Sequence, residues 1–134
     1  MKPDAKDPIL QCVRTSLPAL LGMYAFGSQV QGTATGGSDL DLAVLVAGYV
    51  DPLKLWQLSG DLADLAGCPV DLLDLRAAST VMQYQVITTG QRWWASDAQA
   101  ALYEAAILSE KTELDTARAG LIADISSTGS IHGR

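Results

Sequence analysis

The feature that most constrains the fold is a pair of short apolar runs on either side of a glycine-rich stretch. The first run, ALLGMYAF, covers residues 19–26, and the second, DLDLAVLV, covers residues 39–46. A continuous apolar run of this length is typical of a strand buried on both faces. In the second strand, residues 39, 41, 43 and 45 face one way and residues 40, 42, 44 and 46 the other.

Helix signals lie on both sides of these strands. Asp7-Pro8 resembles an N-cap and first-turn pair, and Pro18 ends the helix that follows. Asp51-Pro52 begins a second helix that Gly67 ends, and its buried side is expected to hold four leucines: Leu55, Leu58, Leu62 and Leu65.

The second half of the chain adds a third strand and two more helices. PVDLLDL, residues 69–75, is the third strand, and Ser79 caps a helix through Thr89 that Gly90 ends. RWWA, residues 92–95, is a short strand or a packed turn, and residues 97–125 have a long helical pattern. The order helix, strand, strand, helix, strand, helix predicts an α/β (α+β) fold, a small mixed sheet with flanking helices and a long C-terminal helix. We expect one domain over residues 1–125 and a flexible tail over 126–134.

Composition excludes several classes of function. Nine basic and fifteen acidic residues give a net charge of -6, which opposes nonspecific binding to nucleic acid or to an anionic membrane. The N-terminus lacks the apolar stretch of a signal peptide, so we expect a cytoplasmic, soluble protein. Cys12, Cys68 and His132 are isolated, which argues against a zinc site.

Two aspartates interrupt the second strand. Asp39 and Asp41 share a face, and two carboxylates about 4 Å apart repel by roughly 4 kcal/mol at an effective dielectric constant of about 20. A divalent cation relieves this repulsion, and Mg²⁺ prefers oxygen ligands that it shares with nucleotide phosphates. Solvent-facing aspartates at strand ends remain the alternative interpretation.

The third strand offers a third acid. Asp71 and Asp74 are three residues apart, so they point to opposite faces, and only one can join the pair. Asp71 is preferred because it lies near the start of its strand with Leu73 and Leu75 behind it, as Ala43 and Leu45 lie behind Asp41.

Gly27-Ser28 follows the first strand directly and opens a turn or short helix. Backbone N–H groups and a hydroxyl in this position can bind an anion, although most such pairs are only turns. A glycine-rich return of ten residues can bring this pair to face Asp39 and Asp41.

Gly27-Ser28, ten residues and then Asp39-Leu40-Asp41 resemble the signature of the polymerase β-like nucleotidyltransferase superfamily. The small size and the segment PVDLLDLRAASTVMQYQVITTGQRWW are similar to the minimal nucleotidyltransferase (MNT) group, whose members are antitoxins to HEPN-domain ribonuclease toxins. The resemblance covers about residues 24–94.

The resemblance implies a minimal nucleotidyltransferase fold and a Mg-dependent enzyme that transfers AMP from ATP to a tyrosine of a HEPN toxin. It also implies roles for individual residues: Gly27 and Ser28 for nucleotide binding, and Asp39, Asp41 and Asp71 for catalysis and for two Mg²⁺ ions. One departure concerns charge. Many relatives carry arginines just after the Gly-Ser pair, whereas this chain has Gln29 and Gln31, so compensation must come from metal, from backbone or from distant groups such as Arg76 and Arg92.

Two other functions remain open. The chain could neutralise a toxin by steric binding alone, through the helix from Asp97 and the Trp93-Trp94 pair, although such a pair is also typical of a core. It could also modify a small molecule, although larger relatives that do so add a helical domain over the substrate. Intact aspartates favour the protein adenylyltransferase.

Overall fold

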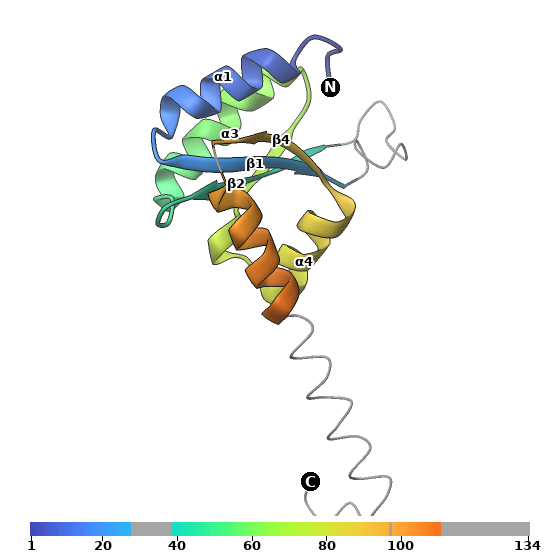
Figure 1. Ribbon diagram of the computed structural model, residues 1–134. Helices are drawn as coiled ribbons and strands as arrows, with labels where there is room; N and C mark the ends of the chain where they lie inside the picture. Colours follow the sequence, from blue (N-terminus) through green and yellow to red (C-terminus); the bar gives the residue numbers. More distant parts are fainter. Residues whose placement is uncertain (28–38, 97, 111–134) are drawn as a thin grey trace, which may run out of the picture.

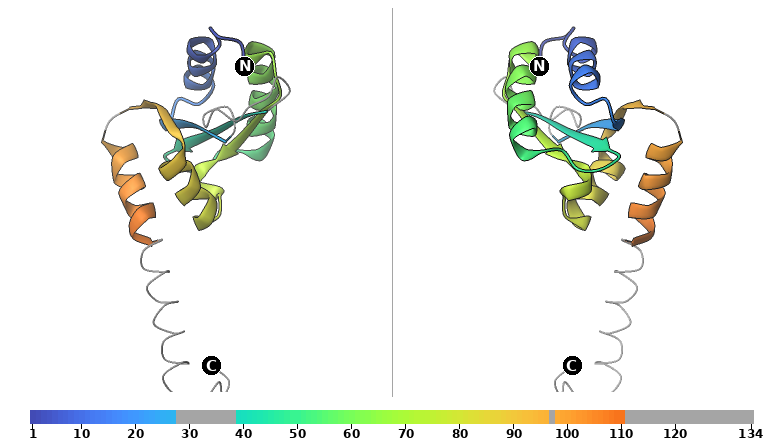
Figure 2. Two further views of the ribbon diagram at one scale, coloured as in Figure 1. Left: turned by 90° about the vertical axis from the view of Figure 1, so that its right-hand side faces the viewer. Right: turned by 90° about the vertical axis from the view of Figure 1, so that its left-hand side faces the viewer.

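A four-stranded sheet lies between two layers of helices in the computed structural model, which describes residues 1–27, 39–96 and 98–110 (Figure 1). Helices α1 (Lys6–Ser16) and α3 (Pro52–Ala66) cover one face. Helix α4 (Thr80–Thr89) and a helix over residues 99–110 lie on the other, as the two side views in Figure 2 also show. The predicted α+β architecture with flanking helices is confirmed.

The strand order is β3-β2-β1-β4. Strand β1 (Leu20–Phe26) pairs antiparallel with both β2 (Leu40–Val46) and β4 (Gln91–Ala95). Strand β3 (Val70–Asp74) pairs parallel with β2, and α3 is the crossover that a parallel pair requires. The sheet is therefore mixed, and RWWA belongs to an edge strand.

Alternation along β2 separates the core into two parts. Leu40, Leu42, Val44 and Val46 pack beneath α1 and α3, whereas Ala43 and Leu45 pack with Val86 of α4 on the opposite face. The predicted two-face pattern is confirmed. Asp41 therefore projects on the α4 side of the sheet.

Caps define the two helices that follow β2 and β3. The Asp51 carboxylate accepts a hydrogen bond from Leu53 N at 3.3 Å at the start of α3, and Gly67 ends α3 in the left-handed conformation with a φ of 72°. A 3-10 turn, η1 (Leu75–Ala77), leads from β3 to α4, where the Ser79 hydroxyl accepts from Met82 N at 3.2 Å.

Two sequence predictions about helices are wrong. Helix α1 begins at Lys6 rather than after Asp7, because Ala5 is its N-cap and is buried in the core. Leu65 is 37% exposed, because the buried stripe of α3 advances in steps of four from Leu58 to Leu62 to Ala66.

The predicted C-terminal helix is described over residues 99–110. Asp97, the rest of that helix and the predicted tail at 126–134 lie outside the described residues. Among the helices that are described, none is both long enough and apolar enough to cross a membrane.

Candidate active site

Two of the predicted acids lie side by side at the start of the parallel strands. Leu40 N donates to Pro69 O at 2.9 Å, and this bond sets a register in which Asp41 pairs with Asp71. Paired residues on neighbouring strands point to the same face, and the strands are about 4.8 Å apart. The parallel register thus joins an acid of β2 to an acid of β3.

Asp41 is the acid whose charged form its surroundings disfavour. Burial, the charge of Asp71 and the charge of Asp39 all raise the pKa of the Asp41 carboxyl above its usual value. Asp39 and Asp71 are themselves exposed to solvent. The site therefore combines one half-buried acid with two acids that water or a ligand can reach.

Gly27 brings the end of β1 against the same acid. Phe26 pairs with Asp41 across the β1–β2 ladder, and Gly27 then turns with a φ of 79°. A Cβ atom at this position would overlap the Asp41 carboxylate oxygen and lie 3.1 Å from its Cγ. Only glycine allows both this backbone conformation and this close approach. Ser28, Gln29 and Gln31 lie outside the described residues.

Asp74 has a different environment from Asp71. It is 6% exposed, and its two oxygens accept hydrogen bonds from Val50 N at 2.8 Å and Arg76 N at 3.1 Å. These bonds hold the loop after β2 and the start of η1 at the end of the sheet opposite Asp41. The structure thus brings together Gly27, Asp39, Asp41 and Asp71, and leaves Asp74 outside this group.

The two arginines considered as charge compensators have other partners. The Arg76 guanidinium lies over the rings of Tyr49 and Tyr103, 5.5 and 5.6 Å from their centroids, beyond the far end of β3. Arg92 Nη1 donates to Glu104 Oε2 at 2.9 Å. Neither arginine is paired with the three acids.

The acids suit a magnesium ion by ligand type. In residues 1–27, 39–96 and 98–110, no three His, Cys, Asp or Glu side chains are arranged to hold a metal ion. Mg²⁺ is usually held by one or two carboxylates together with waters and substrate phosphates. The neighbouring Asp41 and Asp71 fit that smaller set, in which a nucleotide supplies the remaining oxygens.

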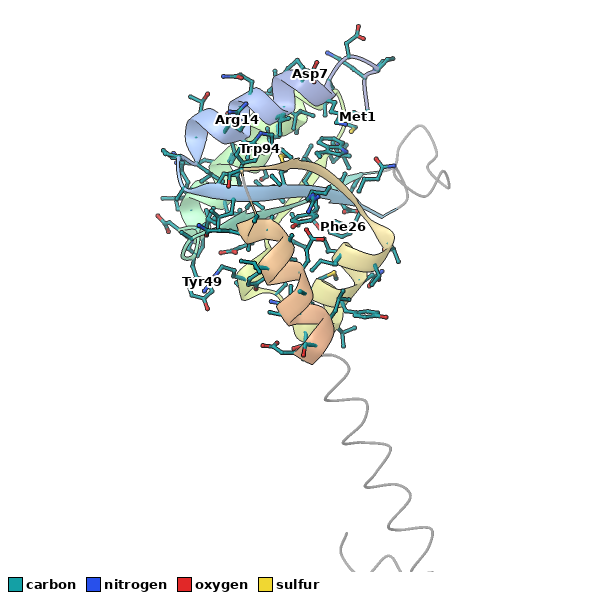
Figure 3. All side chains as sticks on the ribbon, viewed as in Figure 1. Met1, Asp7, Arg14, Phe26, Tyr49 and Trp94 are labelled. Carbon is teal, nitrogen blue, oxygen red and sulfur yellow. The ribbon has the colours of Figure 1, made fainter. Side chains whose placement is uncertain are left out.

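The Trp93-Trp94 pair, a candidate docking surface in the sequence, packs partly against the core. Trp93 and Trp94 are partly buried against the core, and Lys6 and Arg14 lie over their rings at 5.5 and 4.8 Å, with Arg14 and Trp94 labelled in Figure 3. The core alternative therefore holds for this pair. The exposed tryptophan is instead Trp56 on α3, at 73%, which helical spacing alone did not single out.

The sequence also did not predict one contact between distant parts of the chain. The Tyr24 hydroxyl donates a hydrogen bond to Glu104 Oε2 at 2.9 Å. Arg92 Nη1 donates to the same oxygen. Tyr24 and Glu104 are 80 positions apart, so no local pattern marks them as partners.

Comparison with known proteins identifies the family and relatives of this chain. The sequence profile of the family described as polymerase beta, nucleotidyltransferase, matches residues 11–99. The chain is 37% identical over 120 residues to the protein adenylyltransferase MntA of Shewanella oneidensis, covering 90% of this chain and 86% of that protein.

Solved structures give the same relationship. A toxin–antitoxin crystal structure with AMP-PNP superposes with a TM-score of 0.79 at 36% identity, over 90% of this chain and 98% of that chain. A structure of the tri-AMPylated Shewanella oneidensis HEPN toxin in complex with MNT antitoxin gives a TM-score of 0.75 at 32% identity, over 94% and 99%.

Most of the described fold, including β1, β2, β3 and the three acids, lies within the matched residues 11–99. The MntA relative and the two superposed structures each cover at least 90% of this chain. This chain therefore belongs to the polymerase β nucleotidyltransferase family and is a homologue of the protein adenylyltransferase MntA.

Proposed function

We propose that this chain is an antitoxin that transfers AMP from ATP to a tyrosine of a cognate HEPN-domain ribonuclease toxin and thereby neutralises it. The observation that carries the proposal is the pairing of Asp41 with Asp71 beside Gly27. The relationship to MntA, a protein adenylyltransferase, and to chains in toxin–antitoxin structures supports it.

Each residue of the group has a role in this reaction. Gly27 and Ser28 would bind the triphosphate through backbone N–H groups and a hydroxyl, and Asp39, Asp41 and Asp71 would hold magnesium together with oxygens of the nucleotide. The tyrosine oxygen attacks the α-phosphorus, and pyrophosphate leaves. Asp71, which is exposed, takes the phenol proton. Two Mg²⁺ ions would supply Lewis acidity to the attacking oxygen and to the leaving group.

A protein acceptor suits the exposure of the site. Asp39 and Asp71 both face solvent, and transfer to an acceptor other than water requires that water be excluded. The surface of the toxin provides that exclusion when its tyrosine enters. We place the reaction in the cytoplasm, and the net charge of -6 argues against nucleic acid or membrane as a direct partner.

Labelling of the toxin tests the proposal. The chain is incubated with purified toxin, Mg²⁺ and ATP labelled on the α-phosphate, and a parallel sample contains excess EDTA. We expect label on a toxin tyrosine with Mg²⁺ and none with EDTA. Equal labelling in EDTA would contradict the metal requirement, whereas neutralised toxin without any label would show that the chain acts by steric binding.

A further inference from the structure

The four tyrosines of the chain lie in contrasting environments. Tyr24 is buried and donates to Glu104, and burial raises its pKa. Burial also raises the pKa of Tyr103, whose hydroxyl accepts from Gln83 Nε2 at 3.3 Å. Tyr84 is 37% exposed and lies within the regular helix α4.

Tyr49 differs from the other three. It is 69% exposed and lies in the loop between β2 and α3, outside any helix or strand. A Cβ atom added to the neighbouring Gly48 would meet no atom within 4 Å, so there is open space beside Tyr49 at that position. An acceptor tyrosine must be within reach of another molecule's active site, and Tyr49 is the most exposed of the four tyrosines.

We propose that Tyr49 is a self-modification site, which accepts AMP from the active site of a second copy of this chain. The inference rests on the proposed function, because it uses the same transfer of AMP to a protein tyrosine. It adds an acceptor that lies on the antitoxin itself.

A positively charged side chain lies beside this acceptor. The Arg76 guanidinium lies 5.5 Å from the centroid of the Tyr49 ring, and its buried Nε has no hydrogen-bond partner among the described residues. AMP linked to Tyr49 adds an anionic phosphodiester next to that guanidinium. Arg76 therefore stabilises the modified loop by a charge-assisted contact that the unmodified phenol does not provide.

The transfer must occur between two molecules. Strand β2 separates the site from the acceptor, and the rise from Asp41 to Val46 alone is roughly 17 Å at 3.4 Å per residue. Figure 3 shows Tyr49 near one end of the sheet and Phe26, the partner of Asp41, toward the other. An active site cannot reach the Tyr49 of its own chain across this distance.

The step balances with ATP as the only co-reactant. Tyr49 Oη forms a bond to the α-phosphorus, and the bond from that phosphorus to the oxygen bridging to the β-phosphate breaks. Pyrophosphate carries away the bonding electrons. The phenol proton passes to Asp71 of the second copy and then to water.

Intact mass and peptide mapping of the purified full chain test the inference. With ATP and Mg²⁺, we expect the mass of AMP on Tyr49, at a rate that rises with the square of the protein concentration. Tyr49→Phe should lose the modification and Tyr84→Phe should keep it. Toxin is assayed in parallel.

A mixing experiment tests the transfer between copies directly. Asp39→Asn/Asp41→Asn chain serves as acceptor, and Tyr49→Phe chain, which keeps its active site, serves as donor. AMP on Tyr49 of the acceptor supports the proposal. Labelled toxin with an unmodified antitoxin, or label on another tyrosine, would overturn it while leaving the proposed function intact. Absence of label on both proteins would contradict the proposed function as well.

Discussion

At Asp41, the charge that metal binding requires is the form that the folded chain disfavours. It is half-buried, faces Asp71 across the β2–β3 register and feels the charge of Asp39. All three effects favour its neutral form, whereas metal binding requires the carboxylate. The folded chain thus keeps an unfavourable charge in place so that a cation can neutralise it.

Removing that charge is expected to stabilise the fold in the absence of metal. The pKa of Asp41 is higher in the folded than in the unfolded chain, so the folded chain binds the proton more tightly. Stability therefore falls as pH rises through the interval between the two pKa values. Asp41→Asn should raise the Tm at pH 7 in EDTA, and the gain should vanish below the ordinary aspartate pKa of about 3.9.

Magnesium supplies the matched control for this prediction. It should raise the Tm of the unaltered chain by more than that of Asp41→Asn, because only the former contains the full set of charges to be neutralised. An Asp41→Asn chain that is less stable than the original at pH 7 would show that the Asp41 charge does not destabilise the fold.

Asp71 and Asp74 should separate catalysis from stability. Asp71→Asn removes a ligand and proton acceptor on the surface, so transfer to toxin should fall by about 100-fold or more with little change in Tm. Asp74→Ala leaves Val50 N and Arg76 N without their acceptor and should cost about 1–3 kcal/mol of unfolding free energy. The folded fraction of Asp74→Ala should retain most of the activity, and the opposite pattern would assign the third acid to Asp74.

At the scale of elements, Glu104 links the helix over residues 99–110 to two strands of the sheet. Glu104 Oε2 accepts from Tyr24 on β1 and from Arg92 on β4. The pair with Arg92 is partly solvated, with side-chain exposures of 45% and 23%, so it contributes about 0–1 kcal/mol. The buried Tyr24 hydroxyl matters more, because without Glu104 it loses its partner.

Glu104→Ala is therefore expected to destabilise the chain by about 1–3 kcal/mol and to speed hydrogen exchange in residues 99–110. Arg92→Ala is the control, since it removes only the partly solvated ion pair and should cost less than about 1 kcal/mol. Exchange measured by mass spectrometry reports both variants. Equal effects would mean that the ion pair, rather than the tyrosine bond, attaches this helix.

The sequence correctly predicted strand faces and some helix starts, because these depend on neighbouring residues. Alternation placed Leu40 and Leu42 on one face of β2 and Asp41 on the other, and side-chain caps located the starts of α3 and α4. Asp71 was favoured over Asp74 by its place near the start of the strand, yet its pairing with Asp41 depends on a register that the α3 crossover sets. That register is a tertiary property, as is the attachment of Glu104 to Tyr24.

Packing also decided the details in which the patterns were wrong. Asp7 carries a cap signal, but burial of Ala5 sets the start of α1 two residues earlier. Leu65 fits a helical stripe in sequence, but the stripe that contacts the sheet ends on Ala66. In both positions the core, rather than the propensity of the residue, determined the outcome.

At the scale of the whole molecule, the sheet separates two functional ends. Gly27, Asp41 and Asp71 lie where β1 ends and β2 and β3 begin, whereas Tyr49, Arg76 and the exposed Trp56 lie toward the other end of β2 and along α3. Changes to the acids therefore leave the opposite end of the molecule and its core contacts untouched.

This separation makes the roles of catalysis and binding testable in one variant. Asp39→Asn/Asp41→Asn keeps side-chain volume, removes metal affinity and relieves like-charge repulsion, so the chain should fold at least as stably as the original. We expect the double variant to co-purify with toxin and yet to fail to restore growth of cells that express it, because the toxin tyrosine lacks AMP. Intact mass of the co-purified toxin checks the missing group, and the melting temperature of the variant excludes misfolding. If the folded variant restores growth as well as the original chain while the toxin carries no AMP, neutralisation proceeds by occlusion and neither Asp39 nor Asp41 is required for it.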